Sequence, residues 1–385
     1  MELTFGTQRK TIVGYLIMNN LELITKNKLS GNKIGVYFGT WSPFHSGHQQ
    51  DLYRALAVND GVVLVVSGYK GDRGDKIGLP LYKRFRYLRE AFADEPNIVV
   101  AMLNEDNIPR YPDGWEPWLS KLEEIVDKAT TNKDAEITVY TGEQEYDDKF
   151  HELLPEWHTK LEDRKVIPIS ATMIRNDPHK YWNYINRVFR RHFTYKVLVV
   201  GSASVGKSTL IKHVARSVNA PFSTEYARYY EENYNLTDDE LTVDDYSHFF
   251  QGQYDANKAE MHSPANQGIV ICDTDAMVTN VYAKMYLPKE DYENLTQIYA
   301  NTVKKEEWDL IIVIPPITKY VDDGFRNMDW ESTRDAFHDN LMEEISKQGF
   351  SDKVVILDDK GDSSDPQGFL ARYERALELI KNGGK

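Results

Sequence analysis

The stretch Val197-Leu-Val-Val-Gly201-Ser-Ala-Ser-Val-Gly206-Lys207-Ser208-Thr209 decides the fold of the second half of this 385-residue chain. An apolar run at 195–200 leads directly into Gly-x-x-x-x-Gly-Lys-Ser, the pattern of a phosphate-binding loop between a buried strand and a helix. Backbone N–H groups of such a loop surround a β-phosphate, the lysine reaches the β- and γ-phosphate oxygens, and the serine hydroxyl is a ligand of Mg²⁺. We therefore expect a site for ATP and Mg²⁺ made by Gly201, Gly206, Lys207, Ser208 and Thr209, with Lys207 also acting in catalysis.

The next apolar run of this half, at 268–272, ends in two carboxylates, Asp273 and Asp275. A phosphate-binding loop needs an acid on its Mg²⁺ side, so Asp273, directly after the strand, is the expected metal ligand and catalytic residue. Two interpretations of Asp275 stay open: it binds substrate hydroxyls, or it caps the following helix.

A candidate catalytic base lies in Thr224-Glu225-Tyr226-Ala227-Arg228, which follows a short predicted strand at 220–223. In nucleoside kinases an acid after the second strand often takes the proton from the 5′-hydroxyl. We therefore predict that Glu225 is the base and that Arg228, nearby in the substrate site, binds phosphate. A structural ion pair between these two residues is the alternative.

A charged segment, Tyr320-Val-Asp-Asp-Gly-Phe-Arg326, follows the apolar run at 310–314. We predict a lid in which Arg326, or Arg334 in its place, closes over the phosphates and excludes water that would hydrolyse ATP. The alternative is a solvated charged loop.

The first half carries a second candidate site in Ile34-Gly-Val-Tyr-Phe-Gly39-Thr40-Trp-Ser-Pro-Phe-His45-Ser-Gly-His48. This stretch predicts a strand, a Gly-Thr turn at which Gly39 and Thr40 approach a nucleotide, and a helix entered by two histidines. Imidazoles three residues apart project to one side of the first helical turn, where they can donate to phosphate oxygens beside the helix dipole. The arrangement suits nucleotidyl transfer, in which a phosphate attacks the α-phosphorus of ATP while His45 and His48 stabilise the developing charge. For an isolated pair, surface histidines or metal ligands are the alternatives.

A companion segment, Ile169-Ser170-Ala-Thr172-Met-Ile-Arg175, follows a predicted strand at 166–169. Ser170 and Thr172 can cap the next helix while donating to phosphate, and Arg175 can neutralise it as a catalytic residue. Alone, the segment fits an ordinary helix cap; together with the two histidines it predicts a nucleotidyltransferase site.

Further apolar runs of strand length alternate with helix-like segments through both halves. Those of the first half lie at 34–38, 62–66, 98–103, 137–140 and 166–169, with helices expected at 80–92 and 118–129; those of the second lie at 195–200, 268–272, 310–314 and 353–357. This alternation predicts an α/β protein with mainly parallel sheets, covered by helices on both faces. We expect an N-terminal arm or helix at 1–32, a Rossmann-like nucleotidyltransferase domain at 33–194 and a P-loop kinase domain at 195–385. A packed connecting helix is expected within 177–193.

Bulk properties exclude several classes of protein. The formal net charge of −14 argues against non-specific binding to nucleic acid or acidic membranes. The single cysteine, Cys272, excludes an internal disulfide and fits a reducing compartment. No apolar stretch approaches the roughly 18 residues that span a bilayer, so membrane insertion is not expected. Because of the acidic charge, no nucleic-acid partner is expected either. The cytoplasm is the expected location.

Both halves resemble the bifunctional NadR family, which joins a nicotinamide-mononucleotide (NMN) adenylyltransferase to a ribosylnicotinamide kinase. The resemblance covers about residues 33–385. It rests on both motifs and on Val66-Ser-Gly-Tyr-Lys-Gly-Asp-Arg73, Lys83-Arg-Phe-Arg-Tyr-Leu-Arg89, Tyr111-Pro-Asp-Gly-Trp-Glu-Pro-Trp118, Thr224–Arg228, Cys272–Asp275 and the 320–326 segment. It implies that the second domain phosphorylates nicotinamide riboside with ATP and Mg²⁺ to give NMN, and that the first domain then makes NAD and pyrophosphate.

A pyridine nucleotide calls for an aromatic face against its ring, which Trp115 or Trp118 would supply; a place in the core is the alternative for both. Some members of the family begin with a helix-turn-helix domain, but only about 32 residues precede the first strand here, so no operator binding is expected. Contact with a vitamin transporter and a homo-oligomer stay open. Two rival functions remain: a kinase and adenylyltransferase for another vitamin precursor, and a regulator that binds nucleotides without catalysis.

Overall fold

The computed structural model describes residues 28–162, 167–318 and 333–383. The chain divides into two compact units between His192 and Phe193. Within the described ranges, no helix is long and apolar enough to cross a membrane. The predicted lid at 320–326, with Arg326, lies outside the described residues, as does nearly all of the N-terminal arm.

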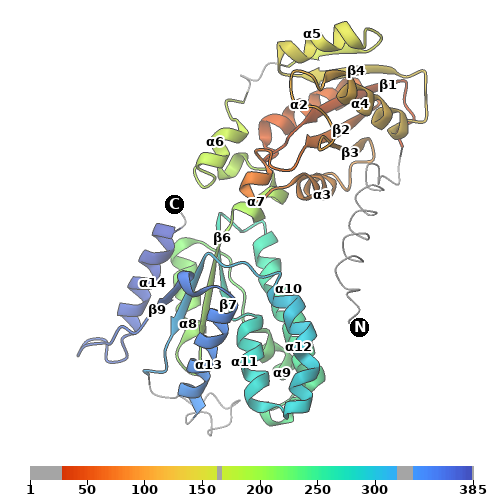
Figure 1. Ribbon diagram of the computed structural model, residues 1–385. Coiled ribbons are helices and arrows are strands. Elements are labelled where there is room, and N and C mark those ends of the chain that lie inside the picture. The colour runs from red at the N-terminus through yellow and green to blue at the C-terminus, as the bar shows by residue number, and fades with distance from the viewer. Residues whose placement is uncertain (1–27, 163–166, 319–332, 384–385) are drawn as a thin grey trace. The chain divides into compact units, whose positions relative to one another are not determined.

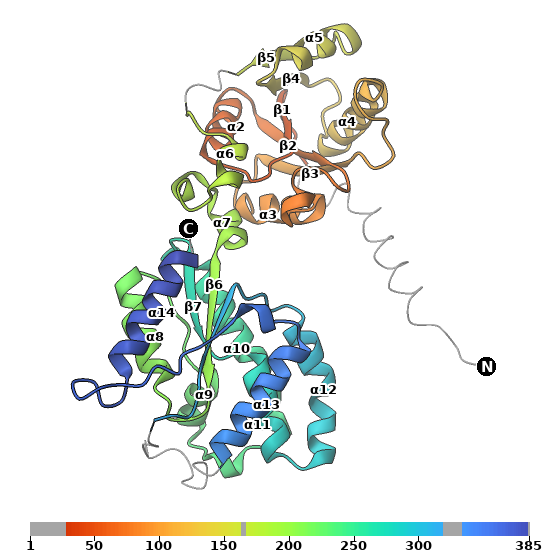
Figure 2. The same cartoon turned by 60° about the vertical axis from the view of Figure 1, so that its left-hand side comes forward.

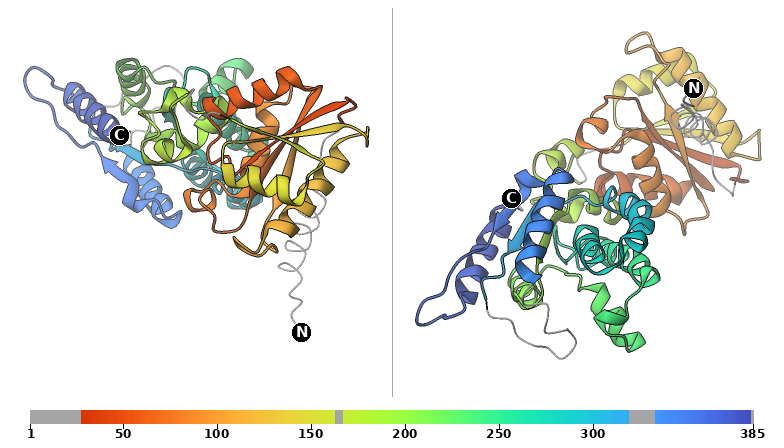
Figure 3. Two further views of the ribbon diagram at one scale, coloured as in Figure 1. Left: turned by 90° about the horizontal axis from the view of Figure 1, so that it is seen from above. Right: turned by 60° about the horizontal axis from the view of Figure 1, so that its bottom comes forward.

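The first unit is built on one sheet of five parallel strands (Figures 1 and 3). Their order is β3-β2-β1-β4-β5, and Figure 2 labels all five. Its strands are β1 (Lys33–Gly39), β2 (Gly61–Gly68), β3 (Ile98–Asn104), β4 (Glu136–Thr141) and β5 (His158–Leu161). Its helices are α2 (Ser46–Val58), α3 (Leu81–Ala91), α4 (Trp115–Ala129), α5 (Gln144–Leu153), α6 (Ala171–Asn176) and α7 (Arg187–Phe193). Strand order reverses between β1 and β4, and open α/β sheets bind ligands at the carboxyl ends of the strands beside such a reversal.

One expectation for the first unit is wrong, and another holds over fewer residues. Residues 167–169 are not a strand; the fifth strand is β5, which pairs with β4. Pro168 has no backbone N–H and so cannot donate a hydrogen bond to a neighbouring strand. Strand β5 is a mostly exposed edge strand, so it lacks the apolar run by which a buried strand is recognised. The helix expected within 177–193 is present but short: the segment first forms a 3₁₀ turn at Trp182–Tyr184, and α7 begins after Asn186, whose side chain accepts from the Val188 N–H.

The second unit has four parallel strands in the order β7-β6-β8-β9, so that β6 lies between β7 and β8. Figure 1 labels β6, β7 and β9 of this sheet. The strands are β6 (Tyr195–Gly201), β7 (Ile269–Asp273), β8 (Leu310–Ile314) and β9 (Val354–Ile356). The helices are α8 (Lys207–Val218), α9 (Tyr226–Tyr234), α10 (Val243–His262), α11 (Ala276–Tyr286), α12 (Lys289–Val303), α13 (Arg334–Lys347) and α14 (Phe369–Gly383). The predicted strand at 220–223 makes only a single bridge, between Phe222 and Ile271.

Strand β6 is buried on both faces, as its continuous apolar run predicts. Leu198 and Val200 join a core with α10, α11, α12 and α13. Val197 and Val199 join a separate core with α8 and α14 on the opposite face. Because side chains alternate along a strand, the two helical layers fix the direction in which β6 delivers the loop that follows it.

Candidate active site

A cavity of about 320 Å³ opens at the carboxyl ends of β1 and β4 in the first unit. Of the residues predicted for this site, its walls contain Gly39, Thr40, His45, His48, Trp118, Ser170, Thr172 and Arg175. The two segments predicted to act together therefore lie around one space, although more than 120 residues of chain separate His48 from Ser170.

The two histidines are stacked. Their ring centroids lie 3.5 Å apart with the planes 22° from parallel, and the His48 N–H donates to Nδ1 of His45 at 3.4 Å. His45 caps α2 and is only 4% exposed, and this burial lowers its pKa to about 4. His45 is therefore neutral near pH 7. With Nδ1 accepting from the backbone, its proton sits on Nε2, which is then a donor.

Arg175 ties the companion segment to the first one. It donates to the carbonyl of Ser42 at 2.7 Å and to the hydroxyl of Thr172 at 2.8 Å. Ser170 caps α6 by accepting from the Met173 N–H at 3.2 Å, as expected. The loop before α2 and the start of α6 are thus joined by one guanidinium.

Gly39 is needed for a reason that the sequence did not reveal. A Cβ at position 39 would lie 2.8 Å from the indole of Trp41, which stands over the turn and donates to the carbonyl of Val65 at 2.9 Å. Trp41 also packs edge-on against His48, with centroids 4.7 Å apart. Close approach of Trp41, and not only of a ligand, therefore demands glycine at position 39.

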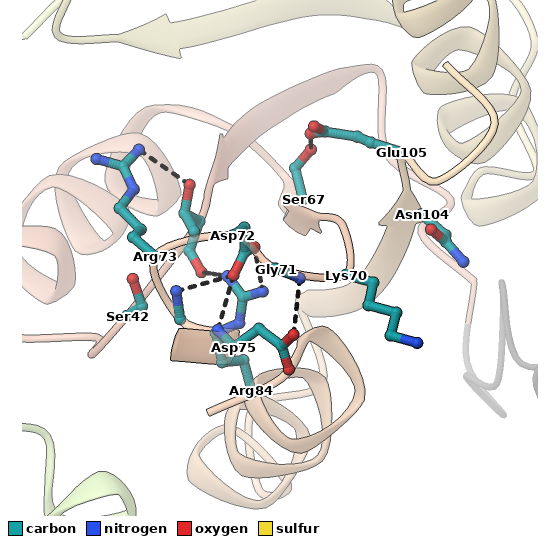
Figure 4. A network of polar contacts seen from close by, with 12 residues as sticks. Ser42, Ser67, Lys70, Gly71, Asp72, Arg73, Asp75, Arg84, Asn104 and Glu105 are labelled. Atoms are coloured by element: carbon teal, nitrogen blue, oxygen red, sulfur yellow. Dashed lines mark hydrogen bonds and ion pairs between the residues drawn. The ribbon is translucent and has the colours of Figure 1, made fainter. Parts of the chain in front are cut away.

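A polar network around the buried Arg84 stabilises the turn at Gly39 and Thr40 (Figure 4). Arg84, fully buried, donates to the Thr40 carbonyl and to the Asp72 carboxylate, each at 2.5 Å. Arg73 donates to the Thr40 hydroxyl at 3.1 Å and lines the cavity. Asp72 in turn accepts from the N–H groups of Gly74 and Asp75, both at 2.8 Å. The sequence prediction assigned no role to these residues.

The two tryptophans differ in position. Trp118 is buried in the core of the unit, as one of the two alternatives predicts, and it also lines the cavity and donates from Nε1 to the Ser67 hydroxyl at 3.2 Å. Trp115 is half-buried and packs edge-on against Tyr146, a cavity residue that the sequence did not single out. Trp115 itself is not part of the cavity wall.

In the second unit, the phosphate-binding loop and the acid of β7 meet as predicted. The Ser208 hydroxyl donates to the carboxylate of Asp273 at 2.7 Å. Lys207 is 6% exposed, and its ammonium donates to the Ser202 carbonyl within the loop at 3.1 Å. Gly201 and Gly206 both have positive φ, 155° and 87°, a backbone geometry that favours glycine. Thr209 lies on the exposed side of α8.

Arg334 reaches the same loop. It is 6% exposed, and it donates to the Thr318 carbonyl at 2.9 Å and to the Ser202 hydroxyl at 3.5 Å. This is the arginine that the sequence offered in place of Arg326.

Glu225 and Arg228 line a smaller cavity, of about 50 Å³, between α9, α10 and α11. Two buried carboxamides of α10 hold its walls. Gln253 accepts from the Tyr226 N–H at 2.7 Å and donates to the Asp273 carbonyl at 3.0 Å. Asn257 accepts from the Ser223 hydroxyl at 2.6 Å. The segment with the candidate base is thereby tied to the segment with the Mg²⁺-side acid.

Close packing of α9 on α10 depends on a glycine. A Cβ at Gly252 would lie 2.2 Å from the ring of Tyr226, so the ring occupies the place of a side chain on α10. Tyr226 directly follows Glu225, and Gly252 directly precedes Gln253. Their contact therefore sets the distance between the start of α9, beside the candidate base, and the part of α10 that carries Gln253.

Asp275 proves to be a helix cap. One of its oxygens accepts from the N–H groups of Met277 and Val278, and the other accepts from Nε1 of Trp308 at 3.1 Å. The side chain is completely buried and does not line the cavity. A contact with substrate hydroxyls is not available in this geometry, because the side chain is buried outside the cavity wall. The residue beside it, Thr274, lines the cavity instead.

The chain is similar to proteins of known families. Residues 196–364 match the model of a family described as AAA domain. Over 360 residues, the chain is 26% identical to the trifunctional NAD biosynthesis/regulator protein NadR of Escherichia coli (strain K12) and 28% identical to the protein of that name from Salmonella typhimurium (strain LT2). Each match covers 90% of this chain and 82% of the relative.

Solved structures give a closer match. A crystal structure of NadR protein in complex with NR is 53% identical, with a TM-score of 0.86, over 93% of this chain and 98% of that one. A crystal structure of NadR protein in complex with NAD and AMP-PNP is 52% identical, with a TM-score of 0.84, over 94% of this chain and 99% of that one. With identity above one half along almost the whole of both chains, and with both predicted sites assembled, this chain belongs to the NadR family.

Proposed function

We propose that this chain makes NAD in two steps, each of which consumes ATP: phosphorylation of nicotinamide riboside to NMN in the second unit, and adenylyl transfer to NMN in the first. The observation that carries the proposal is the pairing of Ser208 with Asp273 in a chain that also stacks His45 on His48 at a separate sheet edge. The ligands named for the related NadR structures, NR, NAD and AMP-PNP, are what these two steps would use or form.

In the kinase step, the loop from Gly201 to Gly206 binds the phosphates of ATP through its N–H groups, and Lys207 neutralises the β- and γ-phosphates. The hydroxyl of Ser208 and the carboxylate of Asp273 are hard oxygen ligands that suit Mg²⁺, and they lie within hydrogen-bond distance of each other. Bound Mg²⁺ would neutralise phosphate charge there.

Glu225 accepts the proton of the substrate hydroxyl as that oxygen attacks the γ-phosphorus. Arg228, in the same cavity wall, binds the substrate or the transferred phosphate. Arg334 stands at Ser202 of the loop, where it can neutralise charge on the phosphates.

In the adenylyl transfer step, a phosphate oxygen of NMN attacks the α-phosphorus of ATP and pyrophosphate leaves. The two imidazoles donate hydrogen bonds to the phosphates, and Arg175 and Arg73 add positive charge at the cavity wall. No covalent intermediate is needed, so the protein contributes position and electrostatic stabilisation. Trp118 offers an aromatic wall for the pyridine ring. A cytoplasmic location is part of the proposal and is consistent with the single buried cysteine.

A product analysis tests both steps. The purified chain is incubated with nicotinamide riboside, ATP and Mg²⁺, and NMN and NAD are separated over time. We expect NMN to appear first and NAD to follow, and no product without Mg²⁺. If neither forms while ATP still binds, the nicotinamide assignment fails. Other vitamin precursors are then tested in the same assay, and a protein that binds nucleotides but converts none of them is a regulator.

A further inference from the structure

Thr274 holds a backbone conformation that its side chain disfavours. It follows β7 with φ of 68°, in the left-handed region, where a β-branched residue is an outlier because its side chain is crowded by the backbone. Its neighbours Asp273 and Asp275 are fixed by contacts of their own, to Ser208 and to the start of α11. Strain of this kind persists only where surrounding contacts impose it.

The contacts that impose it come from α10 and β6. Asn257 donates to the Thr274 carbonyl at 3.1 Å, and the Thr274 N–H donates to the Val199 carbonyl at 3.3 Å. Gln253 donates to the Asp273 carbonyl just before it. Gln253 and Asn257 are each 2% exposed, so these bonds are shielded from water and hold both peptide groups of Thr274 in place.

The Thr274 side chain gains nothing from this arrangement within the protein. The residue is 4% exposed and lines the cavity that contains Glu225 and Arg228. Its Oγ1 is buried and makes no hydrogen bond to any group in the described part of the chain. A buried hydroxyl without a partner loses its hydrogen bonds to water and so destabilises the fold, and valine would fill the same volume without that loss.

A strained backbone and an unsatisfied hydroxyl at one residue both disfavour threonine for folding, so binding is the remaining reason for it. We propose that the Oγ1 of Thr274 hydrogen-bonds a ribose hydroxyl of the nucleoside that the kinase phosphorylates, and so selects for that hydroxyl. The proposal rests on the proposed kinase function. A cavity of about 50 Å³ admits only a hydroxyl-bearing edge of such a ligand, and the rest of the nucleoside lies outside it.

The test compares Thr274→Val, which removes only the hydroxyl, with Thr274→Ser, which keeps it. Thr302→Val is the matched control: Thr302 is 1% exposed, lies on α12 away from the cavity, and donates within its own helix to Ile298. At saturating ATP, we expect Thr274→Val to raise KM for nicotinamide riboside about tenfold or more. The serine variant and Thr302→Val should keep KM near the wild-type value, and adenylyl transfer by the first unit should stay unchanged in all three.

Stability separates this role from a structural one. Because Thr274→Val removes an unsatisfied buried group, its thermal midpoint should equal or exceed that of the wild type. Thr274→Gly, which relieves the positive φ, should raise the midpoint further while it also loses nucleoside affinity. A lower midpoint with unchanged KM in Thr274→Val would overturn the proposal.

Substrate analogues identify the partner. The ratio of kcat/KM between wild type and Thr274→Val is measured for nicotinamide riboside and for its 2′-deoxy and 3′-deoxy analogues. For the analogue that lacks the bonded hydroxyl, the ratio should fall to about one. A ratio unchanged for both analogues contradicts the proposal. If the wild type phosphorylates none of these compounds, the kinase assignment itself fails, which is a separate outcome.

Discussion

The guanidinium of Arg84 donates to the carboxylate of Asp72 at 2.5 Å, and the two side chains are 0% and 5% exposed. The pair joins α3 to the loop after β2 and, through the Thr40 carbonyl, to the turn after β1 (Figure 4). Glycine makes room for it: a Cβ at Gly68 would lie 2.3 Å from the Asp72 carboxylate, and one at Gly74 would lie 2.9 Å from the Arg84 guanidinium. The pair is therefore part of how the candidate adenylyltransferase site is positioned.

Replacing Arg84 with methionine leaves the Asp72 carboxylate buried without its countercharge. We expect the free energy of unfolding to fall by about 3 kcal/mol, the usual loss when one partner of a buried ion pair is removed. Adenylyl transfer should fall at least tenfold, because Thr40 loses its support, while the kinase rate holds. Calorimetry and the two activity assays measure this. Arg86→Met on the exposed side of the same helix is the control, and equal effects of both changes would contradict the role.

Lys207→Ala and His48→Ala should separate the two activities. The first change removes the ammonium from the phosphate-binding loop, and the second removes one imidazole of the stacked pair. Each should lower its own step by roughly a hundredfold or more and spare the other. The steps are assayed singly, by NMN formation from nicotinamide riboside and by NAD formation from NMN. Loss of both activities from either substitution, in a folded protein, contradicts independent sites.

The burial of His45 makes stability depend on acid. Its pKa is about 4 in the folded protein and 6.5 when exposed, so unfolding takes up a proton between about pH 4 and pH 6.5. The stabilising contribution is complete above pH 6.5 and is lost as the pH falls towards 4, by about 3 kcal/mol in all. His45→Asn keeps a capping acceptor but does not titrate in this range. Its unfolding free energy, measured in urea at pH 7 and pH 4.5, should decline less than that of the wild type.

The second unit should respond in the opposite direction. Burial raises the pKa of Asp275 to about 7, and burial, together with the nearby Asp275, raises the pKa of Glu306 well above its usual value. Protonated carboxyls are favoured in the fold, so their contribution is complete below about pH 4 and is lost as the pH rises through about 7. Glu306→Gln still accepts from the Ala276 N–H. It should raise the thermal midpoint at pH 8 by a few degrees and leave it nearly unchanged at pH 5. A lower thermal midpoint of Glu306→Gln at pH 8 would contradict the view that the buried, neighbouring carboxyls of Asp275 and Glu306 destabilise the fold when they are charged.

The sequence predicts the buried strands, because each contains a run of apolar residues. It predicts only some of the polar residues that position the sites. Strand β8 is buried and apolar throughout, and β1 and β6 are largely buried and carry uninterrupted apolar runs at 34–38 and 197–200. Strand β5 lies at an edge, and its sequence, His-Thr-Lys-Leu, carries no such signal.

Some buried polar residues did leave a trace. Arg84 falls on the face of α3 that carries Leu81, Phe85 and Leu88, at spacings of three and four. Gln253 and Asn257 continue the buried face of α10 in the same way. A polar residue at an apolar position predicts a buried polar network. The stacking of Trp41 on Gly39 and the positive φ of Thr274 leave no such trace, because both arise from contacts between distant segments.

Because Tyr226 contacts Gly252, substitutions at these two positions should be coupled in evolution. An aromatic ring beside the candidate base can persist in descendants of this chain only while position 252 stays glycine, since even a methyl group would collide with it. A mutation at 252 is tolerated only after the ring has been lost, so the order of the two changes matters. Sequences that have drifted at one position should have drifted at the other, and an alignment of relatives should show the pair changing together.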